Sequence, residues 1–130
     1  MTSRGWAAGA AILLALSPVG GRAATEANFA ARTTGDLVTL CDPKSDSAID
    51  NAGINFCDGF VQGVILTQQE HQANPRAKQF FCLPDPPPTR NDGVGAFVAW
   101  AQASSDRLSM PAVDGLITFL GEHYPCAKHR

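Results

Sequence analysis

Four cysteines are the residues of this chain whose type could do chemistry most readily. The two closest are 16 positions apart, whereas the cysteine ligands of zinc sites usually come in short pairs such as C-x2-C. Catalysis by cysteine would need a free thiolate beside a base. An even number of widely spaced cysteines in a small chain instead favours two disulfides over a zinc site. These cysteines are Cys41, Cys57, Cys82 and Cys126.

The remaining reactive residue types do not form a catalytic pattern. His71, His123 and His129 are scattered, and each is interpreted as a surface residue, as is Asp58 beside Cys57. The sequence has no H-x-x-x-H pair, no G-x-S-x-G segment and no glycine-rich phosphate loop. We therefore predict no catalytic residue, no metal site and no cofactor, and we interpret the protein as a non-enzyme.

The first 23 residues have the three parts of a secretory signal. Arg4 precedes the apolar run "WAAGAAILLAL", and small residues follow it. The run is too short to span a bilayer as a helix, which takes roughly 20 apolar residues. We predict a signal peptide over residues 1–23, cut after Ala23 or Ala24, and hence an exported protein. Export also suits disulfide formation.

The charge of the exported part argues against nucleic acid as a partner. Loss of Arg4 and Arg22 would change the formal net charge from −2 to −4. Phosphate neutralisation needs a basic patch, and none is present in the sequence. No later segment is long and apolar enough to predict a membrane span after signal cleavage.

The sequence predicts an all-α domain of four short helices, which would position the cysteines and histidines. Apolar residues follow the helical period in "TTGDLVTLC", in "INFCDGFVQGVILTQQEHQ", after Asn91 or Asp92, and after Pro111. Thr33 or Thr34 would cap the first helix, and Asn91 or Asp92 would cap the third. The second has the widest apolar arc, so we expect it to be central.

The segments between these helices are expected to be irregular. "TEANFAAR" is predicted as a loose lead-in, "DPKSDSAIDNAG" as a polar loop and "SSDRLS" as a break. The prolines of "CLPDPPPT" should keep that loop extended, because each fixes φ and disfavours helix before it.

Two glycines lie inside the second helix, where glycine is unfavourable, so their presence requires an explanation. Gly59 and Gly63 lie four residues apart on one stripe, and each costs about 1 kcal/mol relative to alanine. We predict that they pack closely against another backbone. A membrane-type dimer motif is rejected, since the segment is polar in part.

The path of the chain favours one disulfide pattern among three. An up-and-down path pairs Cys41 with Cys57 and Cys82 with Cys126. The segment "ANPRAKQFF" is long enough to run back along the second helix, which would join Cys57 to Cys82 instead. On chain entropy, the larger loop from Cys82 to Cys126 should stabilise more.

Several motifs together resemble the Rap/Tai family of immunity proteins. They are "DLVTLC", "FCDGFVQGV", "FCLP" and the close "MPAVDGLITFLGEHYPC", and the likeness covers a domain over residues 33–126. The resemblance implies a small helical periplasmic protein, often a homodimer. It would neutralise a peptidoglycan amidase effector of type VI secretion by plugging the amidase's active-site groove. The resemblance implies a binding protein, so it assigns no catalytic residue in this chain.

Two other functions remain open at this stage. One is a periplasmic stress protein or holdase chaperone, and the other is an envelope interaction domain without a toxin partner. If the protein is an inhibitor, the candidate contact segments are the polar stretch 68–78 and the rigid loop 85–90.

Overall fold

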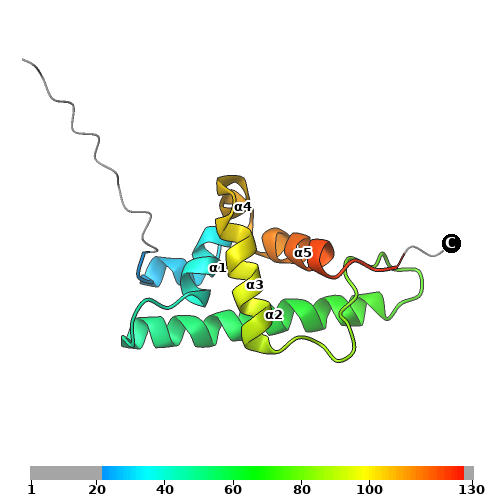
Figure 1. The fold of residues 1–130 in the computed structure, drawn as a ribbon, viewed down its shortest axis with the longest axis horizontal. Coiled ribbons are helices and arrows are strands. Elements are labelled where there is room, and N and C mark those ends of the chain that lie inside the picture. Colours follow the sequence, from blue (N-terminus) through cyan, green and yellow to red (C-terminus); the bar gives the residue numbers. More distant parts are fainter. Residues whose placement is uncertain (1–21, 128–130) are drawn as a thin grey trace, which may run out of the picture.

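The protein folds as a group of helices, which confirms the predicted all-α class (Figure 1). The computed structural model describes residues 22–127, so nearly all of the predicted signal peptide lies outside the described residues. Within that range there are one 3-10 helix, five α-helices and no β-strand. They are η1 (Glu26–Ala30), α1 (Thr34–Cys41), α2 (Ala48–Gln72), α3 (Arg90–Gln102), α4 (Ser105–Ser109) and α5 (Ala112–His123).

The first α-helix begins where its capping residue was predicted. The Asp36 N–H donates to Thr33 Oγ1 at 3.1 Å, and the Thr33 N–H donates back to Asp36 Oδ2 at 3.0 Å, which forms a capping box. Asn28 of η1 adds a hydrogen bond from Nδ2 to Asp36 Oδ1 at 3.0 Å. Burial would raise the pKa of Asp36, but these hydrogen bonds lower it below its ordinary value.

The second helix begins earlier than predicted. It starts at Ala48 rather than Ile54, because Ser47 caps it by accepting a hydrogen bond from the Asp50 N–H at 3.2 Å. The polar residues expected to form a loop therefore supply the cap and the first turns of α2. None of the helices within residues 22–127 meets the length and hydropathy that a membrane span requires.

Two segments predicted as irregular contain short helices, η1 in the lead-in and α4 in the break. Contacts from elsewhere in the chain hold α4 in place. The Arg107 guanidinium lies 4.4 Å from the Trp100 ring centroid, and it donates to the Trp100 carbonyl at 2.8 Å. Glu122 of α5 accepts from Trp100 Nε1 at 2.6 Å and lies 3.7 Å from Arg107. Local sequence patterns cannot show such contacts.

The short helix α1, and not α2, is the centre of the fold. It packs against η1, α2, α3, α4 and α5, and its Leu37 and Leu40 are almost fully buried. The expectation of a central second helix is wrong, because α2 runs along one side of the molecule (Figure 1). Only three of its residues are buried, all in its first ten positions. The rest of the core is supplied mainly by Phe81, Val94, Phe97, Trp100, Ala101, Ala112, Leu116, Phe119 and Leu120.

The two glycines singled out for helix packing have no such partner within the described chain. A Cβ added at Gly59 or Gly63 would meet nothing within 4 Å, and both residues are exposed. Close approaches occur instead at two glycines of α5. A Cβ at Gly115 would overlap Oγ1 of Thr34, which is fully buried in α1, and would lie 3.1 Å from its Cβ and Cγ2. A Cβ at Gly121 would lie 2.9 Å from the backbone carbonyl oxygen of Phe80.

The favoured disulfide pattern is confirmed. Cys41 at the end of α1 is bonded to Cys57 in α2, with the Cα atoms 5.2 Å apart. Cys82 is bonded to Cys126, with the Cα atoms 4.8 Å apart, and this bond joins the segment after α2 to the tail after α5. The alternative pairing of Cys57 with Cys82 is wrong, because Cys57 is bonded to Cys41 and Cys82 lies beside the tail that follows α5.

Candidate functional site

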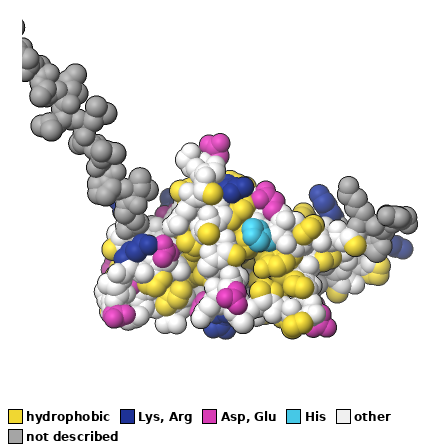
Figure 2. Space-filling view, in the orientation of Figure 1, with side chains coloured by type: hydrophobic (Ala, Val, Ile, Leu, Met, Phe, Trp, Pro, Cys, Tyr) yellow, Lys and Arg dark blue, Asp and Glu magenta, His cyan; other side chains and the backbone are white. Residues whose placement is uncertain are grey.

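A groove of about 540 Å³ lies between the C-terminal half of α2, the proline-rich loop and the ends of α3 and α5. Figure 2 shows hydrophobic side chains gathered on this side of the molecule, to the right of α3. The apolar lining residues are Val61, Ile65, Leu66, Leu83, Pro84, Pro87, Pro88, Val94, Leu116, Phe119, Leu120 and Tyr124.

The α2 wall of the groove is an apolar face that the chain itself leaves open. Val61, Ile65 and Leu66 line it, and the helical period places them on neighbouring positions of one face. Leu66 is 50% exposed, and it is informative because it shares an apolar face with Val61 and Ile65 rather than standing alone on the surface. This half of α2 therefore presents hydrophobic surface that a partner could cover.

The opposite wall is the proline-rich loop, which forms no helix but is not extended throughout as predicted, because it bends at Asp85 and Pro86, which a cis peptide bond joins. Pro84, Pro87 and Pro88 fix the backbone, and Thr89 then caps α3 by accepting from the Asp92 N–H at 3.2 Å. The cap is Thr89, so the prediction of Asn91 or Asp92 was wrong by two or three positions. A loop held in this way loses little further freedom on binding.

Hydrogen bonds fasten the return segment to the end of α2. Gln72 accepts from the Phe80 N–H at 2.9 Å and donates to the Phe81 carbonyl at 3.0 Å. The Cys82 N–H donates to the Tyr124 carbonyl at 2.8 Å, beside the second disulfide. Together with the burial of Phe81, these hydrogen bonds fix the position at which the proline-rich loop begins.

One ion pair crosses the rim of the groove. Arg90 Nη1 of α3 lies 3.4 Å from Asp58 Oδ2 of α2, and the arginine side chain is 61% exposed. Such an exposed pair contributes roughly 0–1 kcal/mol to stability. Its effect is more local, since it orients two polar side chains at the edge of an apolar surface. The lone acid Asp58 therefore has a structural partner.

The residues with potential for catalysis do not come together. His71 ends α2 and His123 ends α5, and both are exposed; the His123 ring packs on Phe119 with centroids 4.4 Å apart. His129 lies outside the described residues. All four cysteines are in disulfides, and residues 22–127 contain no cluster of ligands able to hold a metal ion. Among residues 22–127, the arrangement offers a surface for binding and brings no nucleophile together with a base.

The two predicted contact segments contribute different numbers of residues to the lining of the groove. Loop 85–90 supplies five of its lining residues, whereas the polar stretch 68–78 supplies only Gln69. Sequence reasoning missed the apolar α2 wall and the contributions of Leu120 and Tyr124. The sequence did indicate this wall, because Leu66 widens the apolar arc of the second helix beyond the positions that pack into the core.

Comparison with known proteins identifies one family. A family model described as Rap1a immunity proteins matches residues 33–126, which is most of the chain and nearly all of its described part. Comparisons with curated proteins and with solved structures give no match.

Proposed function

Because the chain belongs to the Rap1a immunity protein family, we propose that it is a periplasmic protein that binds and occludes a peptidoglycan amidase effector of type VI secretion. The family match supports an immunity function against a secreted effector. The amidase and the secretion system come from the resemblance of motifs such as "FCDGFVQGV" to Rap/Tai proteins. An occluding protein needs a complementary surface and no chemistry of its own.

The groove supports a binding role on physical grounds. Specific protein interfaces bury roughly 1,200–2,000 Å² in total, and their centres are apolar with aromatic or aliphatic anchors. Leu66 is an exposed hydrophobic side chain that lines the groove. The proline-rich loop and the bonds around Gln72 hold this surface in a fixed shape. We propose this face as the contact with the effector.

The two disulfides support an exported location. Disulfides persist in oxidising compartments such as the periplasm, and a domain of this size gains much from them. The signal peptide proposed for residues 1–23 would deliver the chain there. The amidase substrate, peptidoglycan, lies in the same compartment.

Inhibition of a candidate peptidoglycan amidase effector tests the proposal. We expect excess protein to suppress muropeptide release from peptidoglycan and to co-elute with the amidase in gel filtration. L66E should weaken both effects at least tenfold, because it places a charge in the apolar wall. V113E is the matched control, since Val113 is a 42% exposed aliphatic residue of α5 that does not line the groove.

The outcomes separate the possible functions. Full amidase activity at excess protein, with no complex, would reject the immunity role. Suppressed aggregation of an unrelated denatured protein under the same conditions would favour the holdase alternative. Inhibition that V113E weakens as much as L66E would place the interface elsewhere on the molecule.

A further inference from the structure

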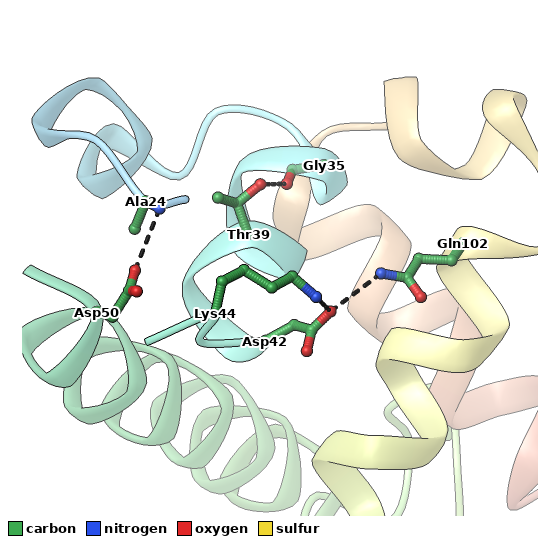
Figure 3. A network of polar contacts seen from close by, with 7 residues as sticks. All are labelled: Ala24, Gly35, Thr39, Asp42, Lys44, Asp50 and Gln102. Atoms are coloured by element: carbon green, nitrogen blue, oxygen red, sulfur yellow. Dashed lines mark hydrogen bonds and ion pairs between the residues drawn. The ribbon is translucent and has the colours of Figure 1, made fainter. Parts of the chain in front are cut away.

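The buried carboxylate of Asp50 lies outside the groove and lacks a side-chain cation. Asp50 is 2% exposed in the first turn of α2. Its Oδ2 accepts from Ser45 Oγ at 2.7 Å. Its Oδ1 accepts from the backbone N–H of Ala24 at 3.2 Å (Figure 3). Buried charges are normally paired, yet the ion pairs of residues 22–127 do not include Asp50. They are Lys44–Asp42, Arg90–Asp58 and Arg107–Glu122.

The chain enters the protein body at the residue that faces this carboxylate. Ala24 is 6% exposed and belongs to the core cluster, whereas Arg22, Ala23 and Thr25 are all exposed. The peptide bond on the N-terminal side of Ala24 therefore joins a buried residue to an exposed one. The nitrogen atom of that bond is the one that contacts Asp50.

The sequence around the same bond independently fits a signal-peptide cleavage site. Such sites have small residues at the last position before the cut and two positions earlier. A cut after Ala23 places Ala23 and Gly21 at these positions. A cut after Ala24 would instead place the large, charged Arg22 at the earlier position. The pattern therefore favours the Ala23–Ala24 bond over its neighbour.

We infer that export processing cuts the Ala23–Ala24 bond and that the new α-ammonium of Ala24 forms a buried ion pair with Asp50. A signal-cleaving endopeptidase adds one water across the bond. The hydroxyl joins the Ala23 carbonyl carbon as a carboxyl group, and the nitrogen of Ala24 becomes an amine that takes up a proton. The inference needs export, as the proposed function does, but it does not need the effector.

Cleavage would therefore create an interaction that stabilises the folded protein. Before cleavage, Ala24 offers Asp50 one neutral N–H; afterwards the same atom carries a full positive charge 3.2 Å from the carboxylate oxygen. The hydrogen bond from Ser45, and further hydrogen bonds that include Ala24, lower the pKa of Asp50 and outweigh its burial, so the carboxylate is ionised at neutral pH. The pair would tie the segment before η1 to the start of α2.

The position of the cut is tested on the full chain. The protein is produced with its own leader in a bacterium and purified from the periplasm, and its intact mass and N-terminal peptide are determined. We expect Ala24 as the first residue. A chain that begins at Thr25 lacks the paired amine, so that result, or retention of residues 1–23, would overturn the inference.

The ion pair is tested by comparing a chain that begins at Ala24 with one that begins at Ala23. The extra residue turns the amine at Ala24 back into an amide, so we expect this form to melt about 4–8 °C lower. Its exposed terminal amine should also be acetylated several-fold faster at neutral pH. D50N should abolish both differences. Equal melting and equal acetylation of the two forms would refute the pair, and the acetylation rates decide even if D50N does not fold.

Discussion

At the residue scale, Gly115 is the position where one added methyl group should matter most. A Cβ at Gly115 would overlap Oγ1 of Thr34, and that hydroxyl donates to the Met110 carbonyl at 3.2 Å. Backbone and side chain are both fixed there, so the methyl group cannot be accommodated easily. We expect G115A to lower the free energy of unfolding by about 1–3 kcal/mol, measured by urea denaturation.

The control for that substitution is G63A. The added methyl group would meet nothing within 4 Å in the described chain, and alanine favours helix, so we expect a gain of up to about 1 kcal/mol. A loss of stability in G63A that depends on protein concentration would instead indicate that the exposed Gly59 and Gly63 stripe packs between two copies, as in the homodimer implied by the family resemblance.

These glycines show what residue spacing can and cannot predict. The four-residue spacing of Gly59 and Gly63 placed them correctly on one stripe of α2. It could not show whether another backbone lies opposite, because that depends on where α2 packs. Gly115 has no distinctive spacing, and its role follows only from the crossing of α1 and α5.

At the element scale, the two disulfides should contribute differently. The chain-entropy model assigns about 4 kcal/mol to closure of the larger loop between Cys82 and Cys126 and about 3 kcal/mol to the loop between Cys41 and Cys57. Burial acts in the opposite sense, because Cys57 is fully buried and its removal leaves a cavity, whereas Cys82 is exposed. The two losses of stability should therefore be similar.

Amidase inhibition should distinguish the two disulfides, even though their removal should cost similar stability. We expect C82A/C126A to free the proline-rich loop from the end of α5 and to weaken amidase inhibition at least tenfold. C41A/C57A should destabilise the core while leaving the groove formed at temperatures below its melting point. Thermal melts and inhibition assays on both double variants check this, and equal inhibition by the two would contradict it.

Element boundaries were predictable where the signal is local. Thr33 and Asp36 form a capping box that was predictable in part. The prolines after Cys82 predicted a segment without helix, although the bend at Asp85 and Pro86 was not predicted. The early start of α2 was missed, because Ser47 lies among polar residues that equally suit a loop. The helix α4 was missed because the contact of Arg107 with Trp100 comes from packing.

At the scale of the whole molecule, the sequence predicted the fold class and the disulfides but not the surface. The groove exists because α1 takes the central position and leaves the second half of α2 uncovered. Its walls come from four separate segments, so no single motif marks it. The resemblance to immunity proteins supplied a function, and the exposed Leu66 now supplies a specific place to test it.

The pH dependence of stability separates an immunity protein from an acid-activated chaperone. Hydrogen bonds hold the pKa values of Asp36 and Asp50 below those of the unfolded chain. A carboxyl group of this kind stabilises the fold at pH values above its unfolded pKa of about 3.9, and the contribution is lost as pH falls through the lower folded value. We therefore expect the urea midpoint, followed by circular dichroism, to fall steeply only below about pH 4. D36N should lower it at pH 7 and flatten the acid branch. Unfolding that begins at pH 5–6 would contradict this expectation and would favour the chaperone, because mild acid would then expose the core.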